Sequence, residues 1–215
     1  MKIKGLDIKL QDKLDRGELL PVMEEFYTIQ GEGFHSGKAA WFIRIGGCDV
    51  GCRWCDVKES WNPNHFPPVS TFDVVKRAVN SGANTVVITG GEPLNYNLDL
   101  LCQLLKESNI STHIESSGSS TVTGQWDWIC LSPKKTKLPV KEIYSISHEL
   151  KIIISDESDF DWAEENRQKV SGNCQLFLQP EWSRREQVIS LITDYVLNHP
   201  EWKVSLQIHK YMHIP

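Results

Sequence analysis

Apolar residues along the chain gather in short runs that are separated by polar segments containing glycine, proline, serine or asparagine. The runs are rich in β-branched side chains, which is typical of β-strands. They predict strands at residues 40–45, 85–89, 111–115, 126–131, 149–154, 175–179 and 203–207. The run at 149–154, ELKIII, suits a strand that is buried on both faces.

The segments between several of these runs show helical periodicity, with apolar residues three or four positions apart. They predict helices at residues 71–81, 98–108, 159–170 and 184–198. In the first helix we expect Phe72, Val75 and Val79 to face the core. Ser183 and Glu186 have the spacing of a capping box at the start of the last helix. Alternating strands and helices indicate an α/β fold, either a doubly wound parallel sheet or a full or partial barrel.

Five unusual loops directly follow predicted strands. Their sequences are GGCDVGCRWC, GGEP, SSGSS, SPKK and QPEW, beginning at residues 46, 90, 116, 132 and 179. In parallel α/β folds, ligands bind beyond the carboxyl ends of the strands. We therefore expect these loops to meet on one rim and to form the functional site.

Length and charge narrow the classes of function. The 215 residues suit one domain spanning 1–215, in which residues 1–20 form an extension of unassigned structure. A net charge of −5 does not favour nucleic-acid binding. No apolar run is long enough for a membrane helix, and the charged N-terminal segment lacks the apolar core of a signal peptide. A cytoplasmic protein without nucleic-acid or membrane partners is expected.

Three cysteines, Cys48, Cys52 and Cys55, lie within eight residues in the pattern C-x3-C-x2-C. A structural zinc site needs four ligands, and His65 could supply the fourth. An iron–sulfur cluster held by three thiolates would instead keep one iron open for a substrate or cofactor. The spacing favours the iron–sulfur site over zinc.

This cysteine motif, with Trp54 before its last cysteine, and the TGGEP segment at 89–93 resemble the two signatures of the radical S-adenosylmethionine (SAM) superfamily. The resemblance implies a partial, TIM-like β/α barrel of roughly six parallel strands. It also implies a [4Fe-4S] cluster on the three cysteines, with SAM on the open iron and reductive cleavage to a 5′-deoxyadenosyl radical. An electron donor such as flavodoxin or ferredoxin would be required. The residues expected at SAM are Gly91, Glu92, Glu115, Ser117, Ser132 and Lys134.

Three further segments, at residues 26–48, 55–61 and 207–215, resemble the 7-carboxy-7-deazaguanine synthase family. The resemblance implies conversion of 6-carboxy-5,6,7,8-tetrahydropterin to 7-carboxy-7-deazaguanine with loss of ammonia, on the route to queuosine and related 7-deazapurines. It also suggests a homodimer. The residues expected at the substrate are Gln30, Glu32, Arg44, Thr89, His209 and Pro215. Two alternatives stay open at this point: another small radical SAM enzyme, such as a glycyl-radical activase, and a zinc-binding or electron-transfer module.

One position departs from the family pattern. Members that bind Mg²⁺ commonly have Thr or Ser directly after Cys-Asp, whereas this chain has Val57, which offers no ligand atom. Asp56, Glu59 and Ser60 are the candidate Mg²⁺ ligands, directly or through water, because Mg²⁺ prefers oxygen ligands. The ammonium group of Lys58 is an alternative source of positive charge. Weakened or absent Mg²⁺ dependence is expected.

Overall fold

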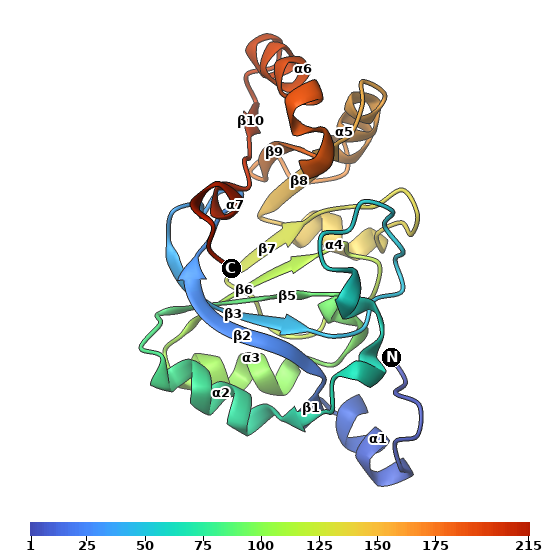
Figure 1. Ribbon diagram of the computed structural model, residues 1–215, viewed down its shortest axis with the longest axis vertical. Helices are drawn as coiled ribbons and strands as arrows, with labels where there is room; N and C mark the ends of the chain where they lie inside the picture. Colours follow the sequence, from blue (N-terminus) through green and yellow to red (C-terminus); the bar gives the residue numbers. More distant parts are fainter.

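A curved sheet of eight strands forms the centre of the computed structural model, which describes residues 1–215 (Figure 1). Its strands are β2 (Val22–Ile29), β3 (Ala39–Ile45), β5 (Thr85–Gly90), β6 (Ser111–Ser116), β7 (Trp128–Leu131), β8 (Glu149–Ile154), β9 (Gln175–Pro180) and β10 (Trp202–Val204). Their order is β10-β9-β8-β7-β6-β5-β3-β2. All neighbours are parallel except β2 and β3, which pair antiparallel.

Because β2 and β10 are opposite edges that do not pair, the barrel is incomplete. The predicted α/β fold with a partial barrel is therefore confirmed, with seven mutually parallel strands where roughly six were expected. Strand β2 was not predicted, because its middle carries Glu24 and Glu25 and it shows no simple alternation of buried and exposed residues. Two short strands, β1 (Leu19–Leu20) and β4 (Val69–Ser70), form a separate antiparallel pair.

The four predicted helices are present as α2 (Thr71–Asn80), α3 (Asp99–Glu107), α5 (Asp159–Arg167) and α6 (Arg185–Asn198). Three shorter helices were not predicted, namely α1 (Ile8–Asp15), α4 (Lys141–Ile146) and α7 (Ile208–Met212). The proline-rich segment after the cysteines contains two 3-10 turns, η1 (Lys58–Trp61) and η2 (Pro63–His65). Two others, η3 (Pro93–Asn95) and η4 (Trp182–Arg184), follow β5 and β9. No helix is both long and apolar enough to cross a membrane.

Two details of the helix predictions were wrong. In α2 the buried face contains Val74, Val75 and Ala78, whereas Phe72 and Val79 are 60% and 45% exposed. The predicted buried face was therefore rotated about the helix axis relative to the observed one. The error arose because Phe72 and Val79 are apolar and were counted as buried. The capping box is also absent.

At the start of α6 the Ser183 hydroxyl donates to Glu181 at 2.6 Å, and no side chain caps the helix. The Ser183 hydroxyl is therefore used within the local turn η4 and does not cap α6.

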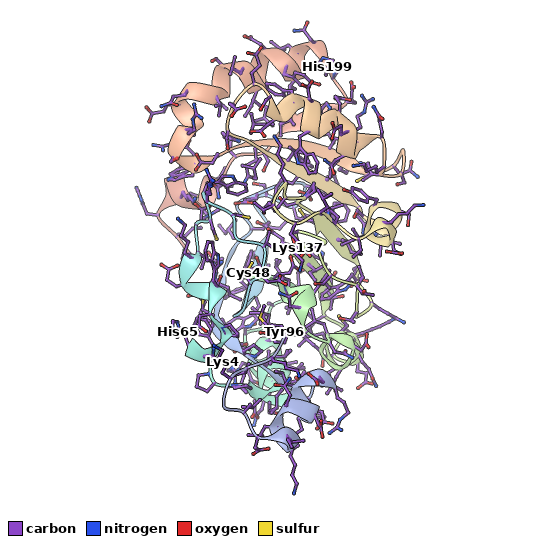
Figure 2. The ribbon with its side chains drawn as sticks, turned by 90° about the vertical axis from the view of Figure 1, so that its right-hand side faces the viewer. Lys4, Cys48, His65, Tyr96, Lys137 and His199 are labelled. Carbon is purple, nitrogen blue, oxygen red and sulfur yellow. The ribbon has the colours of Figure 1, made fainter.

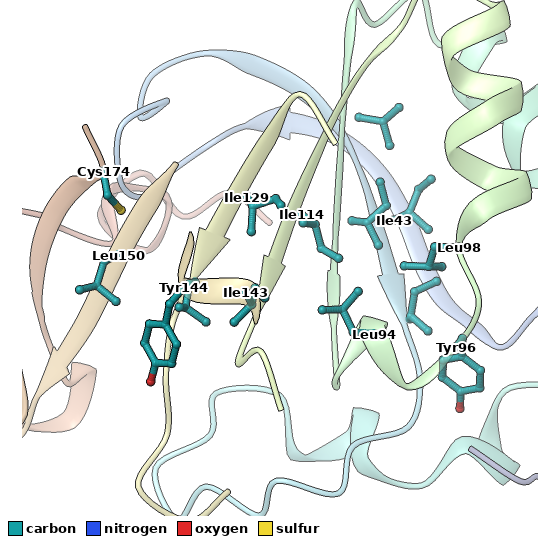
Figure 3. Packing of buried hydrophobic residues seen from close by; sticks show 14 of the residues in the cluster. Ile43, Leu94, Tyr96, Leu98, Ile114, Ile129, Ile143, Tyr144, Leu150 and Cys174 are labelled. Atoms are coloured by element: carbon teal, nitrogen blue, oxygen red, sulfur yellow. The ribbon is translucent and has the colours of Figure 1, made fainter. Parts of the chain in front are cut away.

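Alternate strand residues point to opposite faces of the sheet. One face carries Ile43, Ile114 and Leu150 into a large hydrophobic core that the helices cover (Figure 3). The N-terminal segment joins this core through Ile3 and Leu14. Asp7 caps the start of α1 in this segment, because its carboxylate accepts a hydrogen bond from the Leu10 N–H at 2.9 Å. Residues 1–20 are thus part of the folded structure.

Candidate active site

The second face of the sheet, inside the curve, is polar where its strands end. Arg44, Thr89, Glu115 and Lys151 each directly follow a residue of the hydrophobic core in β3, β5, β6 and β8. Arg44 is in register with Thr89, so the inward residues of adjacent strands are neighbours. The pleat therefore directs these side chains towards the rim loops, away from the core.

The cysteine loop leaves β3 and folds back on η1. The Cys48 N–H donates to the Trp61 carbonyl at 3.1 Å, and the Trp61 indole N–H donates to Cys55 Sγ at 3.4 Å. Asp49 forms an ion pair with Lys137 at 2.7 Å, which joins this loop to the loop after β7. Figure 2 labels Lys137 and Cys48, the cysteine next to Asp49 in the chain. These contacts fix both ends of the loop.

Cys48, Cys52 and Cys55 are free thiols that line one cavity, which we call the cysteine cavity. Burial raises the pKa of the Cys48 and Cys52 thiols above the usual value. The other three cysteines, Cys102, Cys130 and Cys174, are buried and do not line this cavity. The structure thus separates the clustered cysteines from the scattered ones.

All six residues expected at SAM line the cysteine cavity: Gly91, Glu92, Glu115, Ser117, Ser132 and Lys134. They come from three of the five rim loops or the strand ends before them, while the cysteine loop contributes its three cysteines and the fifth loop contributes Gln179. The expected meeting of the loops on one rim is therefore confirmed.

The GGEP loop is packed tightly against the cysteine loop. A Cβ atom added to Gly91 would overlap the Gly47 carbonyl, so only glycine permits this approach. The Gly91 N–H donates to the Ile45 carbonyl at 2.8 Å, and the Glu92 N–H donates to the Gly47 carbonyl at 2.9 Å. The second signature is thereby fixed directly beside the cysteines.

The Glu92 carboxylate is 1% exposed and accepts four hydrogen bonds from the protein. The donors are the Ser116 hydroxyl at 2.6 Å, the Leu94 N–H at 3.1 Å, the Ser117 N–H at 2.9 Å and the Ser117 hydroxyl. Glu92 therefore joins the loops after β5 and β6. Its contact with the SAM ammonium stays a prediction.

Lys134 lies over the Trp54 ring, with its ammonium nitrogen 5.6 Å from the ring centroid. The same ammonium donates to the Ser132 hydroxyl at 2.6 Å and to the Ser132 carbonyl. Burial lowers the Lys134 pKa. Lys134 and Ser132 thus form a hydrogen-bonded pair that lines the cysteine cavity beside Trp54.

A second cavity adjoins the first, and we call it the C-terminal cavity. It is lined by all six residues expected at the substrate: Gln30, Glu32, Arg44, Thr89, His209 and Pro215. Glu32, Asp56, Val57, Thr89, Glu115 and Gln207 line both cavities. Residues of β2, β3 and the loop between them thus meet the C-terminal residues 207–215 beside the cysteine loop.

Two members of this group have specific partners. The Arg44 Nε donates to Glu24 at 2.6 Å, in an ion pair whose carboxylate is nearly half exposed. The ring of His209 lies against the backbone at Gly31, where a Cβ atom would overlap it. Burial lowers the pKa of His209, so its imidazole is neutral at neutral pH.

Asp56 has two partners from the C-terminal segment. The Lys210 ammonium lies 2.7 Å from its carboxylate, and the Gln207 amide donates to the same carboxylate at 3.1 Å. The other candidates for a Mg²⁺ ligand or a source of positive charge do not reach this carboxylate. Lys58 and Glu59 line neither cavity, and the Ser60 hydroxyl donates to the Val57 carbonyl at 2.6 Å. Lys210, not Lys58, is the cation beside Asp56.

Sequence reasoning missed Lys151, Gln179, Gln207 and Lys210 as site residues. Lys151 had a visible signal, because it is the only charged residue inside the apolar run LKIII. It is buried and forms ion pairs with Glu32 and Glu115. Gln179 lies near the end of β9, Gln207 directly before α7 and Lys210 within α7, and the sequence alone does not tell which of these polar side chains point into a cavity.

The residues present fit the cofactors that the sequence resemblance implies. Three unpaired thiols face one space, a glycine-lined backbone segment adjoins them, and polar groups from the neighbouring loops complete the wall. Three soft thiolates with no fourth sulfur suit an iron–sulfur cluster that keeps one open position.

Comparisons with known proteins agree with this geometry. Residues 42–130 match the model of the radical SAM superfamily. The chain is 58% identical to a 7-carboxy-7-deazaguanine synthase from Flavobacterium psychrophilum, over 96% of this chain and 98% of the relative. It is 48% identical to the enzyme of the same name from Synechocystis, over 89% and 92% of the two chains.

A crystal structure of QueE from Escherichia coli superimposes with a TM-score of 0.80. It covers 93% of this chain and 98% of its own, at 27% sequence identity. These relatives favour the synthase over a glycyl-radical activase or a zinc-binding module. The chain therefore belongs to the 7-carboxy-7-deazaguanine synthase family of radical SAM enzymes.

Proposed function

We propose that this protein converts 6-carboxy-5,6,7,8-tetrahydropterin to 7-carboxy-7-deazaguanine with loss of ammonia. The observation that carries the proposal is the common wall of the two cavities. Glu32, Thr89 and Glu115 line both the space at the three cysteines and the space at Arg44 and His209. A pterin in the C-terminal cavity would thus lie directly beside the cofactors in the cysteine cavity.

Cys48, Cys52 and Cys55 would hold a [4Fe-4S] cluster, and the loops around Gly91 and Ser117 would hold SAM. When bound, the cluster and SAM supply the radical chemistry that starts the ring contraction. This chain's own residues position the substrate and enclose the site.

Pterin recognition is supported by the hydrogen-bonding capacity that remains in the C-terminal cavity. An ionised carboxylate has about four acceptor positions, and Glu32 uses two of them, for Lys151 and Gln207. The other two can accept from the guanidine-like N–H groups of a pterin. Gln30 keeps one free amide hydrogen, because its other one goes to Glu115 at 2.8 Å.

Arg44 is proposed to bind the substrate carboxylate. Its guanidinium contacts the nearly half-exposed Glu24 through Nε, so the remaining N–H groups stay available for a second carboxylate. His209 and Pro215 complete the same cavity. A neutral His209 can donate or accept a hydrogen bond without adding charge.

The decisive assay combines the reconstituted protein with SAM, a reductant and the carboxy-tetrahydropterin under anaerobic conditions. We expect 7-carboxy-7-deazaguanine and ammonia in equal amounts, detected by mass spectrometry and an ammonia assay. SAM cleavage without the deazaguanine would refute this substrate. A flavodoxin or ferredoxin is the proposed electron donor in the cell, and a homodimer is the proposed assembly, which sedimentation velocity would test.

We further propose that catalysis here does not depend on Mg²⁺. Val57 offers no oxygen ligand, and Lys210 and Gln207 already contact the Asp56 carboxylate. Lys210 thus provides at Asp56 the positive charge that a metal would otherwise bring.

Turnover with a chelator and with added Mg²⁺ tests this proposal, and equal rates are expected. The double variant Val57→Thr with Lys210→Met introduces a hydroxyl and removes the competing cation. We expect its turnover to rise when Mg²⁺ is added. A strict Mg²⁺ requirement of the unmodified protein would contradict the proposal.

A further inference from the structure

The Lys151 ammonium group lies between two carboxylates inside the barrel. It forms ion pairs with Glu32 and, at 3.2 Å, with Glu115, and its side chain is only 4% exposed. Glu32 comes from the loop after β2, Glu115 from β6 and Lys151 from β8. A single cation thus links three separate parts of the barrel wall.

The contacts around Lys151 form a closed ring. The Glu32 N–H donates to the Gln30 side-chain carbonyl at 3.0 Å, and the Gln30 amide donates to Glu115 Oε1 at 2.8 Å. Lys151 contacts the second oxygen of Glu115 and Oε2 of Glu32, while Gln207 donates to Glu32 Oε1 at 2.8 Å. All of these contacts except the one from the Glu32 N–H end on one of the two carboxylates and so fix its direction.

Both carboxylates line the two cavities, so the ring forms part of their common wall. Two carboxylates held this close in a buried site repel each other, and one of them would take up a proton unless a cation lay between them. Lys134 is not this cation, because its ammonium group is bound at Ser132. Lys210 is not this cation either, because its ammonium group is bound at Asp56.

Other ionisable groups also face the ring. Lys151 interacts with Cys130 of β7 and Glu149 of β8, and Glu32 interacts with His209 of α7. Burial raises the pKa of Glu149, which favours its neutral form. Burial also opposes the charge of Glu32, but Lys151 and the Gln207 hydrogen bond lower the Glu32 pKa to about 2. Despite its burial, Lys151 has a pKa raised well above the usual value by Glu115 and Glu32.

We propose that Lys151 is a positioning residue that keeps Glu32 ionised and aimed at the N–H edge of the pterin. This inference rests on the proposed function of the C-terminal cavity. An ionised Glu32 only accepts hydrogen bonds, which matches the N–H groups of the pterin edge. A protonated Glu32 would turn an O–H donor towards those N–H groups and so weaken binding.

Lys151→Met tests the proposal, because it keeps an unbranched side chain of nearly the same length and removes its charge. In the unmodified protein Glu32 is ionised throughout the neutral range, so it adds no pH dependence to pterin affinity. In the variant, burial dominates and the Glu32 pKa rises into or near that range. Pterin binding should then be weakest at the acidic end of the range and recover as the pH rises and Glu32 loses its proton.

The probe for binding is 6-carboxypterin, the oxidised analogue, titrated calorimetrically against protein carrying the reconstituted cluster. We expect Lys151→Met to weaken binding at least about tenfold near pH 6 and markedly less near pH 9. The matched control is Lys203→Met, because the Lys203 ammonium lies on the surface of β10 and contacts only the Gln175 side chain among hydrogen-bond acceptors. That control should bind as the unmodified protein does at each pH.

Two further variants separate positioning from a merely structural role. Lys151→Arg keeps the charge and should restore pH-independent binding in part. Glu32→Gln removes the titrating group. Combining it with Lys151→Met should therefore weaken 6-carboxypterin binding little further and introduce no pH dependence. A loss of equal size at every pH in Lys151→Met, or losses that multiply in the double variant, would overturn the proposal.

Failure of this inference can be distinguished from failure of the proposed function. If the unmodified protein forms no deazaguanine from the carboxy-tetrahydropterin, the proposed function fails. If it does form the product but Lys151→Met binds 6-carboxypterin like the unmodified protein, only the role of Lys151 is refuted. Circular dichroism on each variant shows whether it is folded.

Discussion

The Glu92 carboxylate accepts hydrogen bonds from both the backbone N–H and the hydroxyl of Ser117. This contact joins the GGEP loop to the loop after β6, and both loops line the cysteine cavity. A buried carboxylate of this kind orients two segments that belong to different βα units. Its removal should affect stability and cofactor binding together.

We predict that Glu92→Gln lowers the free energy of unfolding by about 2 kcal/mol, since an amide NH₂ group would replace one acceptor oxygen and leave a buried donor unpaired. The KM for SAM should rise in the same variant. Urea denaturation and SAM-cleavage kinetics measure the two effects. The exposed Glu107→Gln serves as the control, and an unchanged stability of Glu92→Gln would argue against the loop-joining role.

Arg44→Ala should raise the KM for the carboxy-tetrahydropterin by about tenfold or more, because a charge-assisted contact to the substrate carboxylate would be lost. Binding of SAM should change little, since Arg44 lines only the C-terminal cavity of the two. Arg77→Ala is the matched control: Arg77 forms an ion pair with Glu25, away from both cavities. If the two arginine variants behave alike, Arg44 has no specific contact with substrate.

Cys52→Ala should abolish the visible absorption of an iron–sulfur cluster after anaerobic reconstitution, and SAM cleavage with it. Two thiolates cannot replace the three that the cavity presents. Cys102→Ala should retain both properties, because Cys102 lies buried in α3 outside the cysteine cavity. Full SAM cleavage by Cys52→Ala would refute the cluster assignment.

Acid should destabilise the fold through His113 of β6. Burial lowers the pKa of His113 to about 4, and His35, His148 and Lys38 act in the same direction while Asp127 opposes them. The unfolded chain therefore binds a proton near pH 6.5, before the folded protein does. The stability that neutral His113 contributes is complete above pH 6.5 and is lost as the pH falls from 6.5 towards 4.

Replacing His113 by Gln should reduce this acid sensitivity. After a discount for partial exposure, we expect the difference in unfolding free energy between about pH 7.5 and about pH 5 to shrink by about 1 kcal/mol. Urea titrations at the two pH values measure it. His35 and His209, whose pKa values are also lowered, should leave a residual slope. An unchanged difference would show that His113 is protonated equally in both states.

Short-range patterns were enough for most of the parallel strands and for the rim loops that follow them. Strand β8 begins and ends where its apolar run does, because a strand buried on both faces has no ambiguous boundary residues. Strand β2 was missed, because an edge strand with charged residues carries little of that signal. The face of α2 was misplaced, because Phe72 and Val79 are apolar yet exposed.

The sequence by itself determined the three-cysteine motif, the glycine-containing loop after β5 and the family to which the chain belongs. These features depend on residue types at fixed, short spacings. Only the tertiary structure placed Lys151 between Glu32 and Glu115, and Lys210 beside Asp56. Such pairs join residues far apart in the chain. They form because strand register and the curvature of the sheet bring those residues to one wall, which no local pattern encodes.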